Sequence, residues 1–377
     1  MSTLDGGLVG LGVVGCGGAA LDVVRSVGGS SSVRVVAVHD RDPARAEDLA
    51  RRSGARIRPD LEGLLADPAV DAVYVALPHD LLAPMAVAAL GHGRHVLVEK
   101  PLAVDRRGIA SVRAAAAAAG RSVGVLFELR FVATVRAATD LVRSGALGAI
   151  RQVRIRTLID KPPAYWSSGP TGRVSDPWRA TRERAGGGVV MMNAIHQLDL
   201  VRSIIGQEVV RVAAETEPGV AGVEVEDVAA ATLRFADGAI GSLVASAHAP
   251  GASAGETIEI DGTNGALRLG DPYADLPRLE LYFRAPHLDH PEGRWIRIEP
   301  PAVDPWATAV DAFAAAIRSG GSPVPGLDDA EAALATVLAL YESAAQRTVV
   351  AVRRSFDPPH DGGPLARRPE PDEMEAR

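Results

Sequence analysis

The stretch LVGLGVVGCGGAALD, residues 8–22, decides the fold. A glycine-rich turn between a strand and a helix is a common cradle for a pyrophosphate, because backbone amides at the helix N-terminus point at the anion. The glycines fit this motif in two registers. The first register uses Gly10, Gly12 and Gly15, and the second uses Gly15, Gly17 and Ala20. Only the second leaves an apolar strand of useful length, over residues 8–14, so we favour it.

Each position of the second register has a physical role. We expect Gly15 to form the tight turn, Gly17 to let a phosphate approach the backbone, and Ala20 to pack the helix against the strand. The same cofactor-binding turn then includes Cys16, Gly18 and Ala19. A glycine motif alone is weak support, so a second feature is needed.

The second feature is a carboxylate at the end of the next strand. Residues 33–39 form a β-branched apolar run, and Asp40 follows it, 20 residues after Ala20. A carboxylate at this place accepts the ribose hydroxyls of an adenosine and repels a 2′-phosphate, which favours NAD. Arg41 could pair with such a phosphate or stack on the adenine, so NADP remains possible. Together the two features predict a dinucleotide-binding domain.

Composition excludes several other classes of protein. The chain has 377 residues, of which 47% are hydrophobic and 23% charged, and this indicates a soluble globular protein of two domains. A net charge of −7 provides no basic surface for nucleic acid or an anionic membrane. The single cysteine, Cys16, fits a reducing cytoplasm, and the N-terminus lacks the basic region of a signal peptide. We therefore expect a soluble cytoplasmic protein with no nucleic-acid or membrane partner and no metal site.

Strands and helices alternate through the first third of the chain. Apolar runs at residues 33–39, 72–77 and 94–98 are separated by helical patterns, among them residues 43–53, 83–90 and 111–119. This alternation predicts a doubly wound parallel sheet, that is, a Rossmann domain of the α/β class over residues 1–127.

The pattern of apolar runs changes near residue 150. Longer apolar runs with few helices between them predict an open, mainly antiparallel sheet: residues 150–158, 209–215, 227–235, 239–247, 257–261 and 279–283. Helical patterns return at residues 306–319 and 327–346. We expect residues 128–355 to form an α+β domain for substrate binding and oligomerisation. Residues 356–377 are rich in proline and charge and predict a disordered tail.

The chemistry is expected where strands of the first sheet end, because ligands of doubly wound sheets bind at the carboxyl edge. Two such ends carry Leu77-Pro78-His79 and Glu99-Lys100-Pro101, which should meet near the nicotinamide of the cofactor. A lysine beside that cationic ring has a lowered pKa, and as a cation it can stabilise an alkoxide. Lys100 is therefore a candidate catalytic residue.

A second candidate lies on a predicted helix over residues 189–205, which follows three glycines at 186–188. His196 and Asp199 are three residues apart and share a face of that helix, with Met192 and Asn193 one turn earlier. We take His196 as the candidate acid or base. Asn193 and Asp199 are candidate substrate contacts.

Residues 160–185 form a connection without clear periodicity, and such long loops are commonly functional. The loop contains Trp166, Trp178 and Arg179, which suit a polyhydroxylated ring that needs an apolar face and hydrogen-bond partners. The alternative is an arm that packs on a neighbouring subunit. Arg130, within FELRF, is a further candidate for substrate contact, unless it pairs with an acidic neighbour.

Together these residues resemble the Gfo/Idh/MocA oxidoreductases, which include glucose-fructose oxidoreductase and inositol dehydrogenases. The matching segments are GCGGAA with Asp40, DAVYVALP, HVLVEKPLA, the glycine run leading to His196 and Asp199, VEDVAAATLRFADGAIGSL and YESAAQRTVV. The resemblance implies a Rossmann domain and an open sheet whose outer face forms homodimers or homotetramers. It implies hydride exchange between the nicotinamide and a hydroxyl or keto carbon of a sugar, cyclitol or related polyol. It also implies that Lys100 and His196 flank that carbon.

Two positions depart from the family pattern. Many members carry an aspartate one turn before the histidine, where this chain has Met192, and many have a histidine at the position of Leu82. Because Met192 cannot relay a proton, another group must orient His196 or carry its proton. The candidates are Asn193, Asp199 and Lys100. Two other functions stay open: a dinucleotide-binding regulatory protein without catalysis, and a redox-neutral elimination or hydrolysis assisted by NAD.

Overall fold

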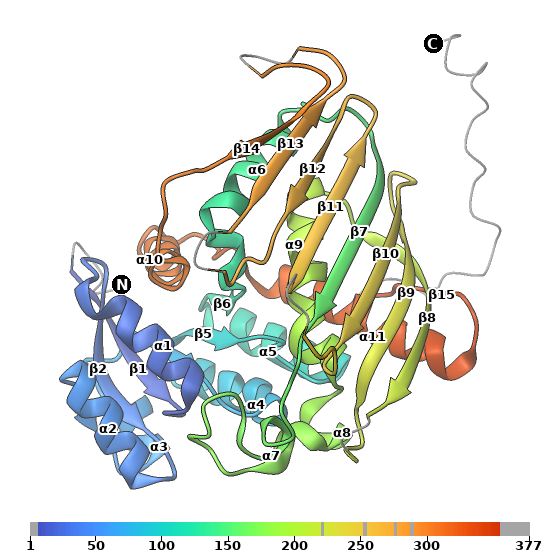
Figure 1. Ribbon diagram of the computed structural model, residues 1–377. Coiled ribbons are helices and arrows are strands. Elements are labelled where there is room, and N and C mark those ends of the chain that lie inside the picture. Colours follow the sequence, from blue (N-terminus) through green and yellow to red (C-terminus); the bar gives the residue numbers. More distant parts are fainter. Residues whose placement is uncertain (1–6, 220–221, 252–254, 275–276, 287–289, 355–377) are drawn as a thin grey trace.

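The computed structural model describes residues 7–219, 222–251, 255–274, 277–286 and 290–354. The predicted tail at 356–377 lies outside these residues. Two sheets organise the chain, the first in blue and cyan in Figure 1 and the second in green, yellow and orange.

The first sheet has six parallel strands in the order β3-β2-β1-β4-β5-β6, as expected for a Rossmann domain. Its strands are β1 (Val9–Val14), β2 (Val33–His39), β3 (Arg56–Ile57), β4 (Ala72–Val75), β5 (His95–Glu99) and β6 (Val123–Leu126). Its helices are α1 (Gly18–Ser26), α2 (Pro43–Ser53), α3 (Leu61–Leu65), α4 (His79–Gly91) and α5 (Arg106–Ala119). β1 ends and α1 begins on either side of residues 15–17, as the second glycine register requires.

The second sheet has nine strands in the order β14-β13-β12-β11-β7-β10-β9-β8-β15. They are β7 (Ile150–Leu158), β8 (Val209–Pro218), β9 (Glu226–Phe235), β10 (Ile240–Ser246), β11 (Glu256–Gly262), β12 (Gly265–Leu269), β13 (Leu279–Phe283), β14 (Trp295–Ile298) and β15 (Val350–Ala351). Every neighbouring pair is antiparallel except β7 and β10. The prediction of a mainly antiparallel second sheet is therefore confirmed.

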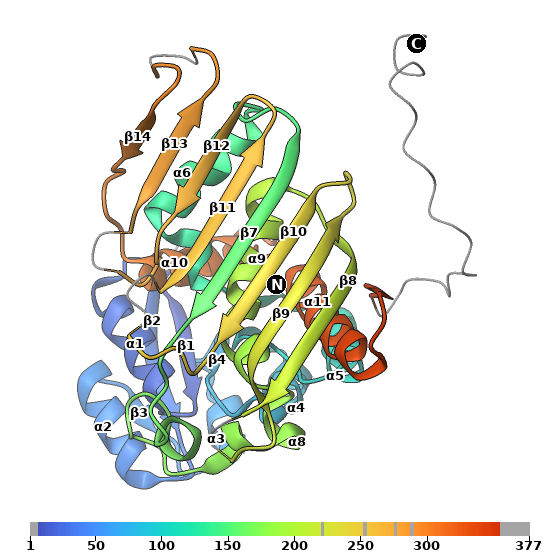
Figure 2. The same cartoon turned by 45° about the vertical axis from the view of Figure 1, so that its right-hand side comes forward.

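Helices cover one face of the second sheet. They are α6 (Ala133–Arg143), α9 (Ile195–Ile205) and α11 (Leu327–Gln346). The other face, turned toward the reader in Figure 2, carries no helix of the described chain. Within those same residues, no helix combines the length and apolar character needed to cross a bilayer.

Three segments differ from the sequence expectations. The predicted helix at 189–205 begins with a π-helical turn, Val190–Ala194, before α9. The connection at 160–185 contains two short helices, α7 (Tyr165–Ser168) and α8 (Arg182–Ala185). Helix α10 (Pro305–Arg318) packs its apolar side, with Val310 and Phe313, into the core of the first sheet. The chain thus returns to its N-terminal half, which the sequence did not lead us to expect.

Candidate functional site

The glycine turn has the backbone geometry that the motif requires. Gly15 has a φ of +89°, and a Cβ atom there would lie 2.2 Å from the carbonyl oxygen of Ala76. The N-terminus of α1 has no side-chain cap and no acidic residue in its first turn. Gly17, Gly18 and Ala19 line a cavity at this end of the helix. Backbone amides and the positive end of the helix dipole therefore face a space that suits a pyrophosphate.

Asp40 follows β2 next to the glycine turn, and its carboxylate is held by three donors. Its carboxylate accepts hydrogen bonds from the backbone N–H of Cys16 at 2.7 Å, from that of Asp42 at 2.8 Å, and from the guanidinium of Arg45 at 2.7 Å. Burial alone would raise the pKa of Asp40, but Arg45 and the two amides outweigh it and lower that pKa. The carboxylate is thus anionic at neutral pH. The sequence did not single out Arg45, whose side chain turns back from α2.

Cys16 and Arg41 contribute in different ways. The Cys16 side chain is fully buried, so this residue takes part through its backbone. Arg41 borders the same cavity as Asp40, and its guanidinium pairs with Asp176 at 2.9 Å while 71% of the side chain is exposed. An exposed arginine can leave such a pair at little cost, since surface ion pairs contribute little stability.

Two adjoining cavities meet beneath the carboxyl edge of the first sheet. The first extends from the glycine turn past Leu77, Pro78 and His79. The second, of about 500 Å³, reaches under the second sheet. Both are lined by Glu99, Lys100, Tyr165, Arg179 and Met192. The two strand ends selected from the sequence therefore converge, and Lys100 lies where the cavities join.

Lys100 is fixed by a main-chain contact. Its ammonium donates a 2.6 Å hydrogen bond to the carbonyl oxygen of Met192. Burial lowers the pKa of Lys100, whereas the charge of Glu99 opposes that shift. Glu99 itself accepts a 2.7 Å hydrogen bond from the hydroxyl of Tyr74. This arrangement places the amino group of Lys100 at the junction of the two cavities.

His196 reaches the second cavity from α9. Its Nδ1 atom is buried and has no hydrogen-bond partner among the residues described, and it lies 3.9 Å from a carboxylate oxygen of Glu128. Burial and the charge of Lys100 hold the pKa of His196 well below its ordinary value. The rings of Phe127 and Tyr273 pack edge-on against the imidazole. His196 is thus a neutral, oriented imidazole at neutral pH.

Several residues of the second cavity were not selected from the sequence. They are Glu128, Lys161, Glu256 and Tyr273. Burial raises the pKa of Glu128 to about 8, with Glu99 adding to the effect, and burial raises that of Glu256 to about 7. Glu128 follows β6 at the same edge of the sheet as Pro78 and Glu99, so the strand-end argument could have found it. Tyr273 lies in a loop after β12 and carries no such signal.

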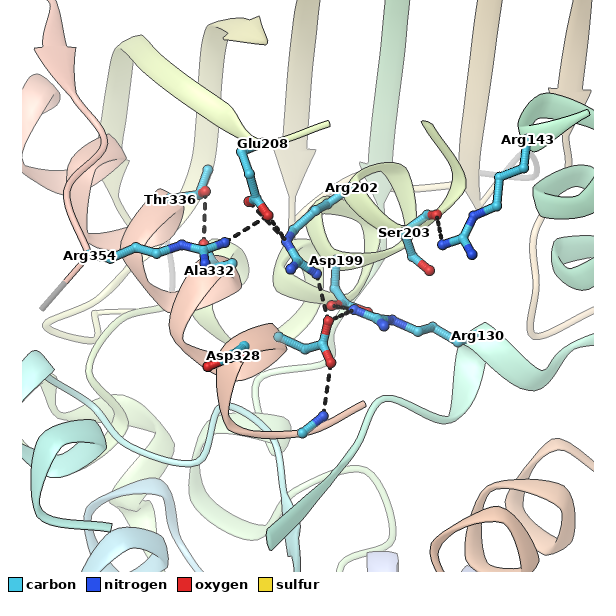
Figure 3. A network of polar contacts seen from close by, with 12 residues as sticks. Arg130, Arg143, Asp199, Arg202, Ser203, Glu208, Asp328, Ala332, Thr336 and Arg354 are labelled. Atoms are coloured by element: carbon cyan, nitrogen blue, oxygen red, sulfur yellow. Dashed lines mark hydrogen bonds and ion pairs between the residues drawn. The ribbon is translucent and has the colours of Figure 1, made fainter. Parts of the chain in front are cut away.

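Arg130 and Asp199 do not line either cavity. Figure 3 shows the guanidinium and the carboxylate facing each other, with Arg202 close by. Arg130 donates to Asp199 through both Nε and Nη2, and to Asp329 at 2.9 Å. Asp199 is fully buried, and both of its carboxylate oxygens accept hydrogen bonds from Arg130. Arg130 thus pairs with an acidic neighbour, the alternative noted from the sequence, and substrate contact by these two residues stays a prediction.

The loop residues separate into two groups. Trp166 is buried in the core and lines neither cavity, so its contact with substrate stays a prediction. Trp178 lines the first cavity, Asn193 the second, and Arg179 both. The Arg179 guanidinium lies 4.4 Å from the Trp178 ring centroid, a cation–π distance.

His79 packs its ring against Trp178, with 4.6 Å between the ring centroids. It donates a 2.8 Å hydrogen bond to the carbonyl of Ala185. Burial and the charge of Lys100 lower its pKa to about 3, so this imidazole remains neutral. His79 therefore forms part of the wall of the first cavity without carrying charge.

Comparison with known proteins identifies the architecture. Residues 9–127 match the family model of oxidoreductases with an NAD-binding Rossmann fold, and residues 135–268 match the GFO/IDH/MocA C-terminal domain. Inositol 2-dehydrogenase from Acidothermus cellulolyticus is 30% identical over 307 residues, which cover 80% of this chain and 84% of that protein. The chain belongs to the Gfo/Idh/MocA family.

Other members of the Gfo/Idh/MocA family are similarly related. 1,5-Anhydro-D-fructose reductase from Ensifer adhaerens is 29% identical over 328 residues, covering 86% of this chain and 92% of that protein. The structure of a levoglucosan dehydrogenase with NADH and levoglucosan superposes with a TM-score of 0.80 at 26% identity, covering 92% of this chain and all of that one. The chain is an NAD-binding oxidoreductase of this family, and the uncapped helix, the Gly15 turn and the anionic Asp40 fit the dinucleotide.

Proposed function

We propose that this protein transfers a hydride between NAD or NADP and a hydroxyl or keto carbon of a sugar, cyclitol or related polyol. The observation that carries the proposal is the convergence of Lys100 and His196 on one cavity adjoining the glycine turn. Relatives named as a sugar reductase and an inositol dehydrogenase support the choice of substrate class. The anionic Asp40 favours NAD, whereas the exposed Arg41 could pair with the 2′-phosphate of NADP.

The charge states of the two residues are complementary. The neutral imidazole of His196 can accept the hydroxyl proton during oxidation, and reduction reverses this transfer. The ammonium of Lys100 stabilises the negative charge that develops on the substrate oxygen. A nicotinamide bound at the junction would supply the hydride acceptor or donor.

The lining of the second cavity suits a polyhydroxylated ring. Lys161, Asn193 and Glu256 offer hydrogen-bond donors and acceptors, while Tyr165 and Trp306 offer aromatic surface. Sugars need both, because their ring faces are apolar and their edges are polar. Arg179 borders this cavity and the first one, and it extends the polar lining toward the cofactor.

Lys100→Met provides the test. We expect kcat to fall by about 10²- to 10⁴-fold, while NADH binding measured by fluorescence stays within a few-fold. Lys161→Met removes another cation from the same cavity and should change KM more than kcat. Turnover is followed by reduced-nicotinamide absorbance over a panel of sugars and cyclitols.

Other outcomes of this experiment contradict the proposal. Unchanged turnover in Lys100→Met would show that Lys100 is not a catalytic residue. Dinucleotide binding without turnover of any panel member would favour a regulatory protein. A co-purifying cofactor with substrate turnover but no net reduction would favour redox-neutral chemistry.

We also propose that the protein acts in the cytoplasm as a homodimer or homotetramer assembled through the open face of the second sheet. Three large apolar side chains on the paired strands β9 and β10 are unusually exposed. They are Val228, Ile240 and Val244, which are 39%, 44% and 45% exposed. The single cysteine fits a reducing compartment. Val244→Asp should lower the mass measured by sedimentation equilibrium, whereas an unchanged mass would exclude this face.

A further inference from the structure

One turn before His196 the chain carries a side chain that cannot ionise. Position 192, one turn before the histidine, is a methionine. Its sulfur accepts a 3.5 Å hydrogen bond from the hydroxyl of Tyr165, and its carbonyl accepts the Lys100 ammonium. The carboxylate of Asp199, on the same helix, is paired with the guanidinium of Arg130. Neither Met192 nor Asp199 is thus available to orient His196 or to take its proton.

A carboxyl group reaches the same imidazole from the first sheet instead. Glu128 begins the short 3-10 helix Glu128–Phe131 after β6, and only 3% of it is exposed. One carboxyl oxygen lies 3.9 Å from Nδ1 of His196, the buried ring nitrogen that has no partner in the described part of the chain. The other oxygen accepts a 3.5 Å hydrogen bond from the hydroxyl of Tyr273. Catalytic hydrogen bonds are often long before ligands bind and shorten in the complex.

We propose that Glu128 is the positioning residue of His196 and exchanges a proton with its Nδ1 atom. The proposal rests on the proposed hydride transfer. In the oxidative direction the substrate O–H bond breaks as an H–Nε2 bond forms, and the Nδ1–H proton passes to the Glu128 carboxylate. The electron pair of the substrate C–H bond leaves as hydride to the nicotinamide, and a C=O bond forms. Reduction reverses each step, with protonated Glu128 as the starting state.

The groups around Glu128 set its pKa, and this pKa determines the pH range in which oxidation or reduction is favoured. The groups that face Glu128 are Glu99 at the end of β5, Lys100 directly after that strand, His196 from α9, Tyr273 from the loop after β12 and Tyr74 from β4. Burial and the charge of Glu99 raise the pKa of Glu128 to about 8, although Lys100 and Tyr273 oppose the shift. Below pH 8 the group is a proton donor suited to reduction. Above pH 8 it is a carboxylate suited to oxidation.

The first test is the pH profile of kcat/KM. For the wild-type protein we expect oxidation to rise, and reduction to fall, as pH increases through about 8. Glu128→Gln keeps the size of the side chain but cannot ionise, so its profile should lose this inflection and kcat should fall by about 10²-fold. Glu128→Asp should keep the inflection with part of the rate. Tyr273→Phe removes the hydroxyl that lowers the pKa of Glu128, so its profile should keep the inflection and move it to higher pH.

The second test does not depend on turnover. In the ¹⁵N-histidine spectrum of the NADH-bound protein, the His196 ring signals, assigned with His196→Gln, should shift as pH passes through about 8. This shift should be absent in Glu128→Gln. If it is present while no polyol is turned over, the proposed function fails and the Glu128–His196 coupling stands. If neither the spectrum nor the pH profile differs between wild type and Glu128→Gln, the coupling is overturned.

Discussion

The ammonium of Lys100 donates a 2.6 Å hydrogen bond to the main-chain carbonyl of Met192. Lys100 follows β5 of the first sheet, and Met192 lies in the π-helical turn that precedes α9, so this bond joins the two halves of the site. Because the acceptor is a backbone atom, the contact does not depend on the side chain at position 192. A methionine at position 192 is therefore compatible with this placement of Lys100.

Two glycine substitutions should separate folding from cofactor binding. In Gly15→Ala a Cβ would lie 2.2 Å from a carbonyl oxygen at a φ of +89°, so we expect lower thermal stability and lost binding. In Gly17→Ala the nearest protein atom is 3.6 Å away and the φ of −76° suits alanine, so stability should hold. NADH affinity should nevertheless fall at least tenfold, about 1.4 kcal/mol, because the methyl group faces the phosphate. Tight binding by Gly17→Ala would contradict the chosen register.

Asp40→Asn should weaken NADH binding by about 10- to 100-fold, because a charge-assisted hydrogen bond to the ribose is worth about 1.5–3 kcal/mol. NADPH binding should improve, since the repulsion of a 2′-phosphate is removed. Fluorescence titration with both cofactors measures the change. Arg41→Ala, on the exposed side of the same cavity, is the comparison: it should reduce NADPH affinity and leave NADH within a few-fold. Equal effects of both variants on NADH would argue against ribose recognition by Asp40.

Asp199→Ala should destabilise the protein without changing the chemistry. It leaves Arg130, whose side chain is only 10% exposed, without its main partner, and losing one partner of a buried ion pair costs about 3–5 kcal/mol. Denaturant titration measures the loss, and kcat per folded molecule should stay within a few-fold. The exposed pair of Asp22 and Arg25 is the control, and Asp22→Ala should cost less than about 1 kcal/mol. A stable Asp199→Ala protein without turnover would instead support the role in substrate contact suggested by the sequence.

The single cysteine offers a measurement that depends on pH. Burial, together with Asp40, raises the pKa of Cys16 from 9.0 to about 12, so the thiol stays protonated in the folded state. Only the thiolate is alkylated, so iodoacetamide labelling at pH 8 should be about 10³-fold slower in folded than in unfolded protein. Labelling followed by mass spectrometry at several pH values checks this. Fast labelling of the native protein would show that the glycine turn opens to solvent.

The sequence by itself determined the elements whose signal is local. The glycine turn, Asp40 after a β-branched run and Lys100 before a proline are each read from a few adjacent residues, and their geometry follows from strand, turn and helix periodicity. The alternation of strands and helices likewise predicted that the first sheet is parallel. Such features are predictable because the residues that form them are adjacent in the sequence and are therefore also close in space.

Only the tertiary structure decided which distant groups meet. Arg130 and Asp199 are 69 residues apart and pair in the interior, while Glu128 and His196 come from different halves of the chain and face one cavity. Trp166 lies in the core although its neighbour Tyr165 lines the site. Charges and aromatic rings have no sequence signal for their partners, because pairing depends on which faces of α9, β6 and the loop are packed together. The position of Lys100 could be predicted, but the carboxyl group beside its partner histidine could be seen only in the folded chain.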